Sequence, residues 1–347
     1  MKNDTPTTFV IFGITGNLSK RKLIPALLDL FAKNMLPDEF RLVGFSRGAY
    51  TVEEFQNFIA DTVKAKGTSY GPELVTSFAK RAYHCQGAFE EKEAYDRIAQ
   101  TLFAIDEKEI KRCSNKLFYL AVSPSSYAVI FDHLASSGLT IPCGGAEGWT
   151  RVLVEKPFGK DLETAQELEG RLSALFQEEQ IFRIDHYLAK ETVQNILAFR
   201  FSNILFEPLW SNRYIERIEI NLHEQFGIEG RGAFYDGVGA LRDVGQNHVL
   251  QMLALVAMED PKELNVSLIR RERAGVLDSL QLKEPMSKDS LRRGQYIGYR
   301  KEEYVAPHSE TETYFRVAAE VNNERWRGVL WILEAGKKMK ETKAEIR

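Results

Sequence analysis

Apolar runs alternate with amphipathic stretches through the first half of the chain. The runs that predict buried strands lie at residues 9–12, 42–45, 117–122 and 152–154. The stretches that predict helices follow residue 18, cover 52–65 and 161–177, and follow Pro124. Because strands and helices that alternate in this way build βαβ units, we expect a parallel sheet covered by helices on both faces.

The second half of the chain has a different pattern. The expected elements are a half-exposed antiparallel strand at 215–222, a long helix at 241–258, and strands at 313–321 and 329–333. The charged region 260–312 predicts no particular element, and residues 337–347 show neither a helix cap nor an apolar face. The change of pattern predicts a domain boundary between about 180 and 200.

Composition and charge exclude several classes of protein. The chain has 347 residues, 44% of them hydrophobic and 27% charged, with a net charge of −3. This length suits two globular domains, and the near-neutral charge provides no basic surface for nonspecific nucleic-acid binding. No apolar run approaches the ~18 residues of a membrane-spanning helix, and no signal-peptide-like segment precedes the first predicted strand. We therefore expect neither a nucleic-acid nor a membrane partner.

The cysteines indicate the redox environment. Cys85, Cys113 and Cys143 are widely spaced, odd in number and form no CxxC pair. This pattern argues against a disulfide framework and against a zinc site, so no bound metal is expected. It is typical of a protein in the reducing cytoplasm.

A glycine turn separates the first predicted strand from the first predicted helix. Its sequence is GITGNLSK, residues 13–20, and Gly13 and Gly16 let the backbone approach a pyrophosphate at a helix N-terminus. The spacing is GxxG rather than GxGxxG, which by itself also fits an ordinary turn. Its place in the first strand–helix connection favours dinucleotide binding.

The end of the second predicted strand distinguishes two coenzymes. An NAD site places an acidic residue there to bind the ribose 2′-hydroxyl, but this chain has Ser46-Arg47-Gly48, and the next acid is Glu53. A guanidinium matches the geometry of a 2′-phosphate. Arg47 therefore predicts NADP in preference to NAD, unless it is simply a surface arginine.

Three further segments carry candidate chemistry. Lys156 ends the strand at 152–154, and the carboxyl ends of parallel strands face the ligand crevice, although a solvated lysine is as good an interpretation. The run RIDHYLAKE at 183–191 places His186 and Lys190 four residues apart, on one face of a helical start. Imidazole, phenol and ammonium groups suit a phosphate, while the alternative is a helix start capped by Asp185.

The third segment is the helix predicted at 241–258. Leu241, Val244, His248, Met252 and Leu255 share one stripe, which places His248 on the apolar face. A histidine there is either a hydrogen-bonded core residue or a partly buried general base that needs an orienting partner. Asp185 is a candidate for that partner.

Taken together, these motifs resemble those of the glucose-6-phosphate dehydrogenases over nearly the whole chain. The matching segments are the glycine turn, EKPFG at 155–159, RIDHYLAKE at 183–191, GRG at 230–232, RDVGQNH at 242–248, NERW at 323–326 and AGK at 335–337. The resemblance implies a Rossmann-type α/β coenzyme domain over residues 1–185. An α+β domain with a largely antiparallel sheet is then expected over 186–347, with the sheet incomplete in this chain.

The resemblance also implies an activity and a set of roles. The expected reaction is NADP-dependent oxidation of glucose 6-phosphate at C1 to the 6-phosphogluconolactone, the first step of the oxidative pentose phosphate pathway. The expected catalytic residues are His248, as the base, and Asp185, which orients it. The expected substrate-binding residues are Lys156, His186, Tyr187, Lys190, Glu224, Asp243 and Lys337. The expected coenzyme-binding residues are Gly13, Thr15, Gly16, Asn17, Leu18, Arg47 and again Lys156, whose bond to Pro157 is expected to be cis.

Several departures from the family pattern leave alternatives open. Gln225 stands where the family usually has proline, and Asn17 where aspartate is common. Family members are expected to continue beyond the residue that matches Arg347, into a region that completes the sheet and the interface of their homo-oligomers. The alternatives are therefore an inactive or unstable fragment and a different sugar dehydrogenase without a phosphate clamp. Dual use of NAD and NADP also remains open.

Overall fold

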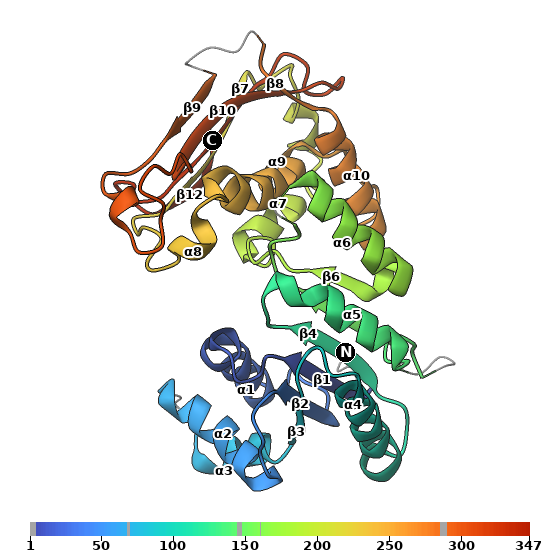
Figure 1. Ribbon diagram of the computed structural model, residues 1–347. Helices are drawn as coiled ribbons and strands as arrows, with labels where there is room; N and C mark the ends of the chain where they lie inside the picture. Colours follow the sequence, from blue (N-terminus) through green and yellow to red (C-terminus); the bar gives the residue numbers. More distant parts are fainter. Residues whose placement is uncertain (1–4, 68–69, 144–147, 160, 285–289) are drawn as a thin grey trace. The chain divides into compact units, whose positions relative to one another are not determined.

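The computed structural model describes residues 5–67, 70–143, 148–159, 161–284 and 290–347. They form two compact units, Met1–Ile184 and Asp185–Arg347, which are described separately below (Figure 1). The boundary expected from the sequence lies one residue beyond this division.

A six-stranded parallel sheet forms the centre of the first unit. Its strand order is β3-β2-β1-β4-β5-β6. The strands are β1 (Thr7–Phe12), β2 (Phe40–Ser46), β3 (Ala82–Gln86), β4 (Asn115–Leu120), β5 (Thr150–Val154) and β6 (Ile181–Arg183). The sequence predicted four of these strands, but missed β3 and β6, which are short and carry no continuous apolar run.

Helices cover both faces of this sheet, as predicted. They are η1 (Ser19–Leu23), α1 (Ile24–Ala32), α2 (Val52–Ala65), α3 (Pro72–Ala79), α4 (Lys92–Ala104), η2 (Ile105–Ile110), η3 (Pro124–Ser126), α5 (Tyr127–Ser136), α6 (Leu162–Leu175) and η4 (Glu178–Gln180). Alternate residues of β1 serve the two faces, because successive side chains of a strand point in opposite directions. Ile11 packs with α1, α2 and α3, whereas Val10 and Phe12 pack with α4, α5 and α6.

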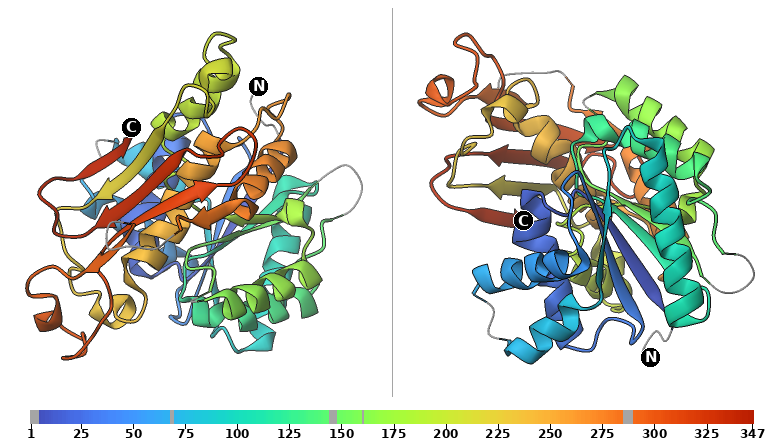
Figure 2. Two further views of the ribbon diagram at one scale, coloured as in Figure 1. Left: turned by 90° about the horizontal axis from the view of Figure 1, so that it is seen from above. Right: turned by 60° about the horizontal axis from the view of Figure 1, so that its bottom comes forward.

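A mixed, mostly antiparallel sheet forms the second unit, with the order β12-β7-β11-β10-β8 and with β9 also paired to β10 (Figure 2). The strands are β7 (Arg217–His223), β8 (Leu280–Leu282), β9 (Leu291–Gly294), β10 (Tyr314–Val321), β11 (Leu330–Gly336) and β12 (Lys343–Ile346). The helical segments are α7 (Glu191–Phe201), η5 (Glu207–Leu209), α8 (Gly232–Tyr235), η6 (Leu241–Val249), α9 (Leu250–Ala257), α10 (Val266–Asp278) and η7 (Tyr299–Lys301). Apolar residues of β7, β10 and β11 share one core with α7, α9 and α10.

Four expectations for the second unit were incomplete or wrong. β7 pairs antiparallel with β12, as expected, but parallel with β11. Leu241 is 43% exposed and not on the buried stripe, since residues 241–249 form a wider π-helical turn. The region 260–312 forms α10, β8, β9 and η7, and residues 343–346 pair with β7 as β12.

The expectation of no disulfide was also wrong. Cys113 and Cys143 are joined by a disulfide in the structure, with a Cα–Cα distance of 6.2 Å, whereas Cys85 is a buried free thiol. The two cysteines lie 30 residues apart in sequence. They meet because Cys113 precedes β4 and Cys143 precedes β5, which are adjacent parallel strands whose amino ends share one edge of the sheet.

Candidate active site

A buried histidine–carboxylate pair lies in the second unit. His248 belongs to η6 and is 2% exposed, and its Nδ1 atom lies 2.7 Å from Oδ1 of Asp185. The same carboxylate oxygen accepts the backbone N–H of Tyr187 at 2.9 Å. Because an ionised carboxylate can only accept, Nδ1 of His248 is the donor, and in the neutral imidazole Nε2 carries the lone pair. The pair therefore has the tautomer that a general base requires.

Burial and hydrogen bonding have opposite effects on the pKa of Asp185. Burial acts most strongly on Asp185 and by itself would raise the pKa of the carboxyl group. The hydrogen bond and charge of His248, the Tyr187 backbone N–H and the charge of His186 outweigh burial and hold this pKa below its ordinary value. Asp185 is thus held as a carboxylate beside the imidazole.

The lowered pKa of Asp185 predicts an acid-sensitive contribution to stability. The folded-state pKa lies below the unfolded value of ~3.9, so the carboxylate stabilises the fold above that pH, and this stabilisation is lost as pH falls through the folded value. We expect Asp185→Asn to destabilise the protein near neutral pH and to differ less from the wild type at about pH 3. Urea unfolding from about pH 6 to pH 3 measures both. A constant difference across that range would contradict the prediction.

Three aromatic and basic side chains surround the pair. The imidazole of His186 contacts that of His248 edge-on at 4.6 Å between centroids, and the phenol ring of Tyr187 stacks on His248 at 4.3 Å. Nζ of Lys190 lies 3.5 Å from the centroid of the Tyr187 ring. Burial, followed by the charges of Glu224 and Asp185, raises the pKa of Tyr187, so the phenol remains a hydrogen-bond donor. The structure thus brings together all five residues that the sequence singled out here.

The local geometry differs from the expected helical start. Residues 185–190 form turns, and α7 begins only at Glu191, with Lys190 in an extended conformation before it. Asp185 therefore does not cap a helix but accepts the N–H two residues later, as in an Asx turn. His186, Tyr187 and Lys190 meet through a tilted ring contact and a cation–π contact rather than along one helix face.

Lys337 and Glu224 form a second charged pair. Their Nζ and Oε2 atoms are 2.5 Å apart, and the Lys337 side chain is only 2% exposed. They meet because β7 and β11 run parallel, so that the backbone N–H of Glu224 donates to Gly336 O at 2.9 Å. The ammonium also lies 5.3 Å from the centroid of the Tyr235 ring.

Two residues of this region were missed by the sequence analysis. Burial, followed by the charge of Asp243 and then the charges of other groups that include Glu224, raises the pKa of Tyr235. Tyr235 therefore lies within electrostatic range of two predicted substrate residues, and its position three residues after the GRG motif is the only sequence signal for it. Burial lowers the pKa of Arg273 in α10, and the charge of Asp185 partly opposes this effect. Arg273 lies in a run of charged residues in the sequence, so no local pattern distinguishes it as a site residue.

The predicted coenzyme residues lie in the first unit, where the glycine turn follows β1. Gly13 has a φ of +76°, and a Cβ atom there would lie 2.6 Å from the carbonyl oxygen of Ala121, so only glycine fits. The turn is closed by the N–H of Gly16, which donates to Gly13 O at 2.9 Å, and by the hydroxyl of Ser19 on the same oxygen. The backbone then continues into η1 and α1. Thr15, Asn17 and Leu18 lie in this turn or at its junction with η1.

Arg47 and Lys156 follow the carboxyl ends of two strands of this unit. Arg47 comes directly after β2 and is exposed. Lys156 follows β5 closely and is partly buried, and its bond to Pro157 is cis, as expected. The preceding Glu155 accepts a hydrogen bond from the hydroxyl of Tyr119, a partner that the sequence did not indicate.

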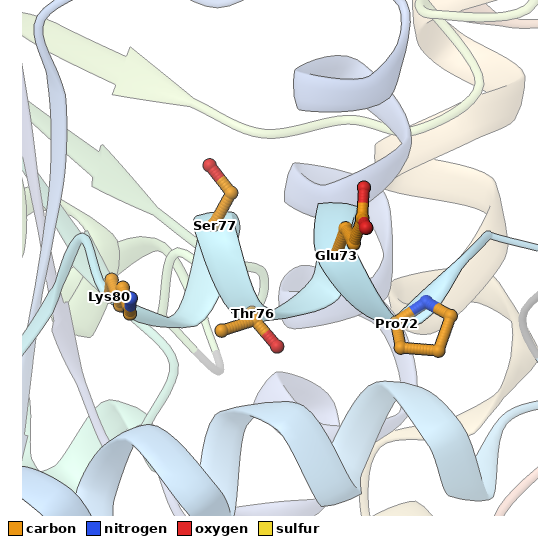
Figure 3. A pocket seen from close by; sticks show the side chains of 5 residues that line it. All are labelled: Pro72, Glu73, Thr76, Ser77 and Lys80. Carbon is orange, nitrogen blue, oxygen red and sulfur yellow. The ribbon is translucent and has the colours of Figure 1, made fainter.

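One surface pocket lies on α3 of the first unit. Its lining residues are Pro72, Glu73, Thr76, Ser77 and Lys80, whose side chains are shown in Figure 3. None of them is a predicted site residue, and they include no histidine or aromatic side chain that would match the cluster around His248. The residues of this pocket therefore give no reason to place the active site there.

Comparison with known proteins gives the family. The NAD-binding domain of glucose-6-phosphate dehydrogenase matches residues 10–195, and the C-terminal domain of the same enzyme matches residues 197–347. The chain belongs to the glucose-6-phosphate dehydrogenase family. Glucose-6-phosphate 1-dehydrogenase 2 of Mycobacterium tuberculosis is 40% identical over 352 residues, and the alignment covers 98% of this chain and 68% of that protein. The cytoplasmic glucose-6-phosphate 1-dehydrogenase 5 of Arabidopsis thaliana is 42% identical, with 98% and 66% covered.

Solved structures of this glucose-6-phosphate dehydrogenase family support the same conclusion. The enzyme from Mycobacterium avium matches with a TM-score of 0.86 and 36% identity, over 99% of this chain and 72% of the solved chain. A glucose-6-phosphate dehydrogenase in complex with its substrate glucose 6-phosphate matches with a TM-score of 0.89 and 33% identity, over 100% and 72%. The predicted fold class, a Rossmann-type α/β unit followed by a largely antiparallel α+β unit, is confirmed. Among the described residues, we find no helix of the length and apolar character needed to cross a bilayer.

Proposed function

We propose that this chain oxidises D-glucose 6-phosphate at C1 to 6-phospho-D-glucono-1,5-lactone, with NADP⁺ as the hydride acceptor, as in the first step of the oxidative pentose phosphate pathway. The observation that carries this proposal is the contact of His248 with both Asp185 and the phosphate-type donors His186 and Tyr187. A base oriented by a carboxylate, next to groups that suit a phosphate, fits a phosphorylated sugar alcohol.

The base acts at the C1 hydroxyl. Nε2 of His248 takes the hydroxyl proton while the hydrogen on C1 leaves with its electron pair, so that C1 becomes the lactone carbonyl. The Asp185 carboxylate accepts a hydrogen bond from Nδ1–H, which fixes the tautomer and stabilises the imidazolium that forms. General-base catalysis of this kind is typically worth ~10²- to 10⁴-fold in rate.

The remaining residues of the second unit position the sugar. His186, Tyr187 and Lys190 offer imidazole, phenol and ammonium donors to the phosphate, which aligns the distant C1 with the base. The carboxylates of Glu224 and Asp243 suit sugar hydroxyls, and the buried ammonium of Lys337 holds Glu224 in place at 2.5 Å. These roles are our proposal from their chemistry and placement.

The first unit carries groups that fit NADP⁺. Gly13, whose φ of +76° and close approach to Ala121 exclude a side chain, forms the tight turn that offers its backbone to a pyrophosphate at the start of the η1–α1 helix. Arg47 offers its guanidinium to a 2′-phosphate, and Lys156 offers an ammonium group that suits the orientation of sugar and coenzyme. When bound, NADP⁺ supplies the nicotinamide that accepts the hydride.

Steady-state assays of the purified chain test this proposal. Glucose 6-phosphate and NADP⁺ should give NADPH, and glucose itself should be a far poorer substrate because it lacks the phosphate. Equal rates with glucose would instead favour a different sugar dehydrogenase. A folded protein that binds NADP⁺ but produces no NADPH would favour an inactive fragment. A parallel assay with NAD⁺ determines whether the chain uses both coenzymes.

Cellular location and assembly are also proposals. The named Arabidopsis relative is cytoplasmic, and we propose the same location for this chain. The family resemblance implies homo-oligomers whose interface is formed by a region that follows the residue matching Arg347. Size-exclusion chromatography with light scattering measures the mass in solution directly.

A further inference from the structure

A titratable side chain is bonded to the end of β2, the strand that precedes Arg47. Nε2 of His84 on β3 lies 2.9 Å from Oγ of Ser46, the last residue of β2. Two further bonds tie the strand ends together: the Gln86 amide donates to Arg47 O at 3.3 Å, and the N–H of Gly87 donates to Ser46 O at 3.1 Å. The Ser46–His84 contact is thus part of a firmly held strand end.

This strand end is the place that distinguishes NAD from NADP. In dinucleotide-binding folds the residues after the second strand meet the adenosine ribose, where NAD carries a 2′-hydroxyl and NADP a 2′-phosphate. The glycine turn is tied to the same strand end, because the backbone N–H of Gly13 donates to Phe45 O at 3.0 Å. Ser46 and Arg47 therefore lie on the path from the pyrophosphate turn to the ribose.

The surroundings of His84 are mostly aromatic. Its ring lies 4.9 Å from that of Tyr50 and 5.0 Å from that of Phe55 on α2. The Tyr50 ring also carries a titratable phenol. Of the charged groups on adjoining elements, Arg47 follows Ser46 in sequence, and Lys20 of η1 lies over the ring of Phe58, which stacks on Phe55. Burial lowers the pKa of His84 below its ordinary value, so the neutral ring is favoured at physiological pH and protonation requires more acidic conditions than for a free imidazole.

We propose that His84 is a specificity-determining residue that sets the hydrogen-bond direction of the Ser46 hydroxyl and so makes the choice between NAD⁺ and NADP⁺ depend on pH. In the neutral tautomer of His84 that carries its proton on Nδ1, the Ser46 hydroxyl donates to Nε2, and its oxygen presents lone pairs that suit a ribose 2′-hydroxyl. When Nε2 takes a proton from solvent, it donates to Ser46 Oγ, and the Ser46 O–H turns to donate to a 2′-phosphate. This inference rests on the proposed function, since it requires a coenzyme at the glycine turn.

Calorimetric titrations of the full chain with NADP⁺ and NAD⁺, without sugar, test the proposal. Between about pH 8 and pH 5.5, the preference for NADP⁺ should rise about fivefold to tenfold more in the wild type than in Ser46→Ala, the effect of one hydrogen bond to a charged group. The Ser46→Ala reference is needed because the 2′-phosphate itself titrates near ~6. His84→Phe, which preserves packing on Tyr50, should behave like Ser46→Ala.

His133 provides a matched control. Its ring lies 4.9 Å from that of Tyr95, the same distance as between His84 and Tyr50, but it belongs to α5. His133→Phe should therefore keep the pH profile of the wild type. Proton NMR should also show that NADP⁺ raises the pKa of His84 more than NAD⁺ does.

The outcomes separate this inference from the proposed function. Identical pH profiles in the wild type and Ser46→Ala would overturn the role of His84 even if NADP⁺ binds well. Failure of the wild type to bind NADP⁺ at any pH would instead overturn the proposed function. If His84→Phe does not fold, the comparison of the wild type with Ser46→Ala still decides the question.

Discussion

Replacement of His248 by asparagine should lower kcat for glucose 6-phosphate oxidation by about 10²- to 10⁴-fold. The amide can still donate a hydrogen bond to Asp185, so the buried pair keeps a partner, but it cannot take the C1 hydroxyl proton. KM should change little, because the lost interaction is one that matters in the transition state. Initial rates of NADPH formation, with substrate varied at saturating NADP⁺, measure both parameters.

His223 supplies the matched control for this variant. It lies in the same unit and also contacts a carboxylate, with its Nε2 atom 3.0 Å from Oε1 of Glu334. His223→Asn removes a histidine–carboxylate contact at a sheet position outside the proposed machinery, and kcat should remain within about twofold of the wild type. A His248→Asn enzyme with nearly full kcat, or an equal loss in His223→Asn, would show that His248 is a core histidine.

The sequence predicted the first unit well because its elements are locally encoded. Helix 52–65 was predicted with the bounds that α2 has, since Thr51 caps it through the N–H of Glu54 and its apolar residues repeat at helical spacing. The strands β1, β2, β4 and β5 are buried on both faces and are therefore nearly continuous apolar runs. β3 was missed because His84 and Gln86 interrupt its apolar residues, and β6 was missed because that strand has only three residues; pairing with a neighbouring strand is what defines both.

The second unit was predicted less well because its decisive contacts are distant in sequence. The parallel pairing of β7 with β11 joins residues more than a hundred positions apart, and no local pattern encodes strand direction. The Cys113–Cys143 disulfide likewise follows from the adjacency of β4 and β5, which cysteine spacing does not report. Both the β7–β11 pairing and the disulfide therefore depend on the topology of the sheets and not on local sequence patterns.

The candidate site was predicted less completely than the first unit and more completely than the second. Residue types and spacing singled out His248, Asp185 and the 186–190 segment, and the 2.7 Å contact of His248 with Asp185 agrees with the predicted pairing. The helical spacing that was used to group His186 with Lys190 was nevertheless wrong, because the chain turns before α7 begins. The residue types of this segment thus indicated which side chains come together, although the conformation expected for the segment was wrong.

Replacement of Lys190 by methionine should lower kcat/KM for glucose 6-phosphate by about 10- to 100-fold and leave the rate with unphosphorylated glucose nearly unchanged. The ammonium lies 3.5 Å from the centroid of the Tyr187 ring and is solvent-exposed, at the residue before α7. It is therefore available to a dianionic ligand, which the N-terminal N–H groups of α7 also favour. Methionine preserves the length and the apolar contact of the side chain and removes only the charge.

Lys338→Met is the control for Lys190→Met. Its Nζ atom also lies over a tyrosine ring, 4.5 Å from the centroid of Tyr296, and it is a neighbour of Lys337 in the same unit. Lys338→Met removes an equal charge and a longer cation–π contact, together with an ion pair to Glu302 at 3.4 Å, so the loss of one positive charge from the unit is matched. If Lys190 binds the phosphate, only Lys190→Met should narrow the preference for glucose 6-phosphate over glucose. A similar change in both variants would mean that the long-range charge of the second unit, and not a phosphate clamp at residues 186–190, selects the substrate.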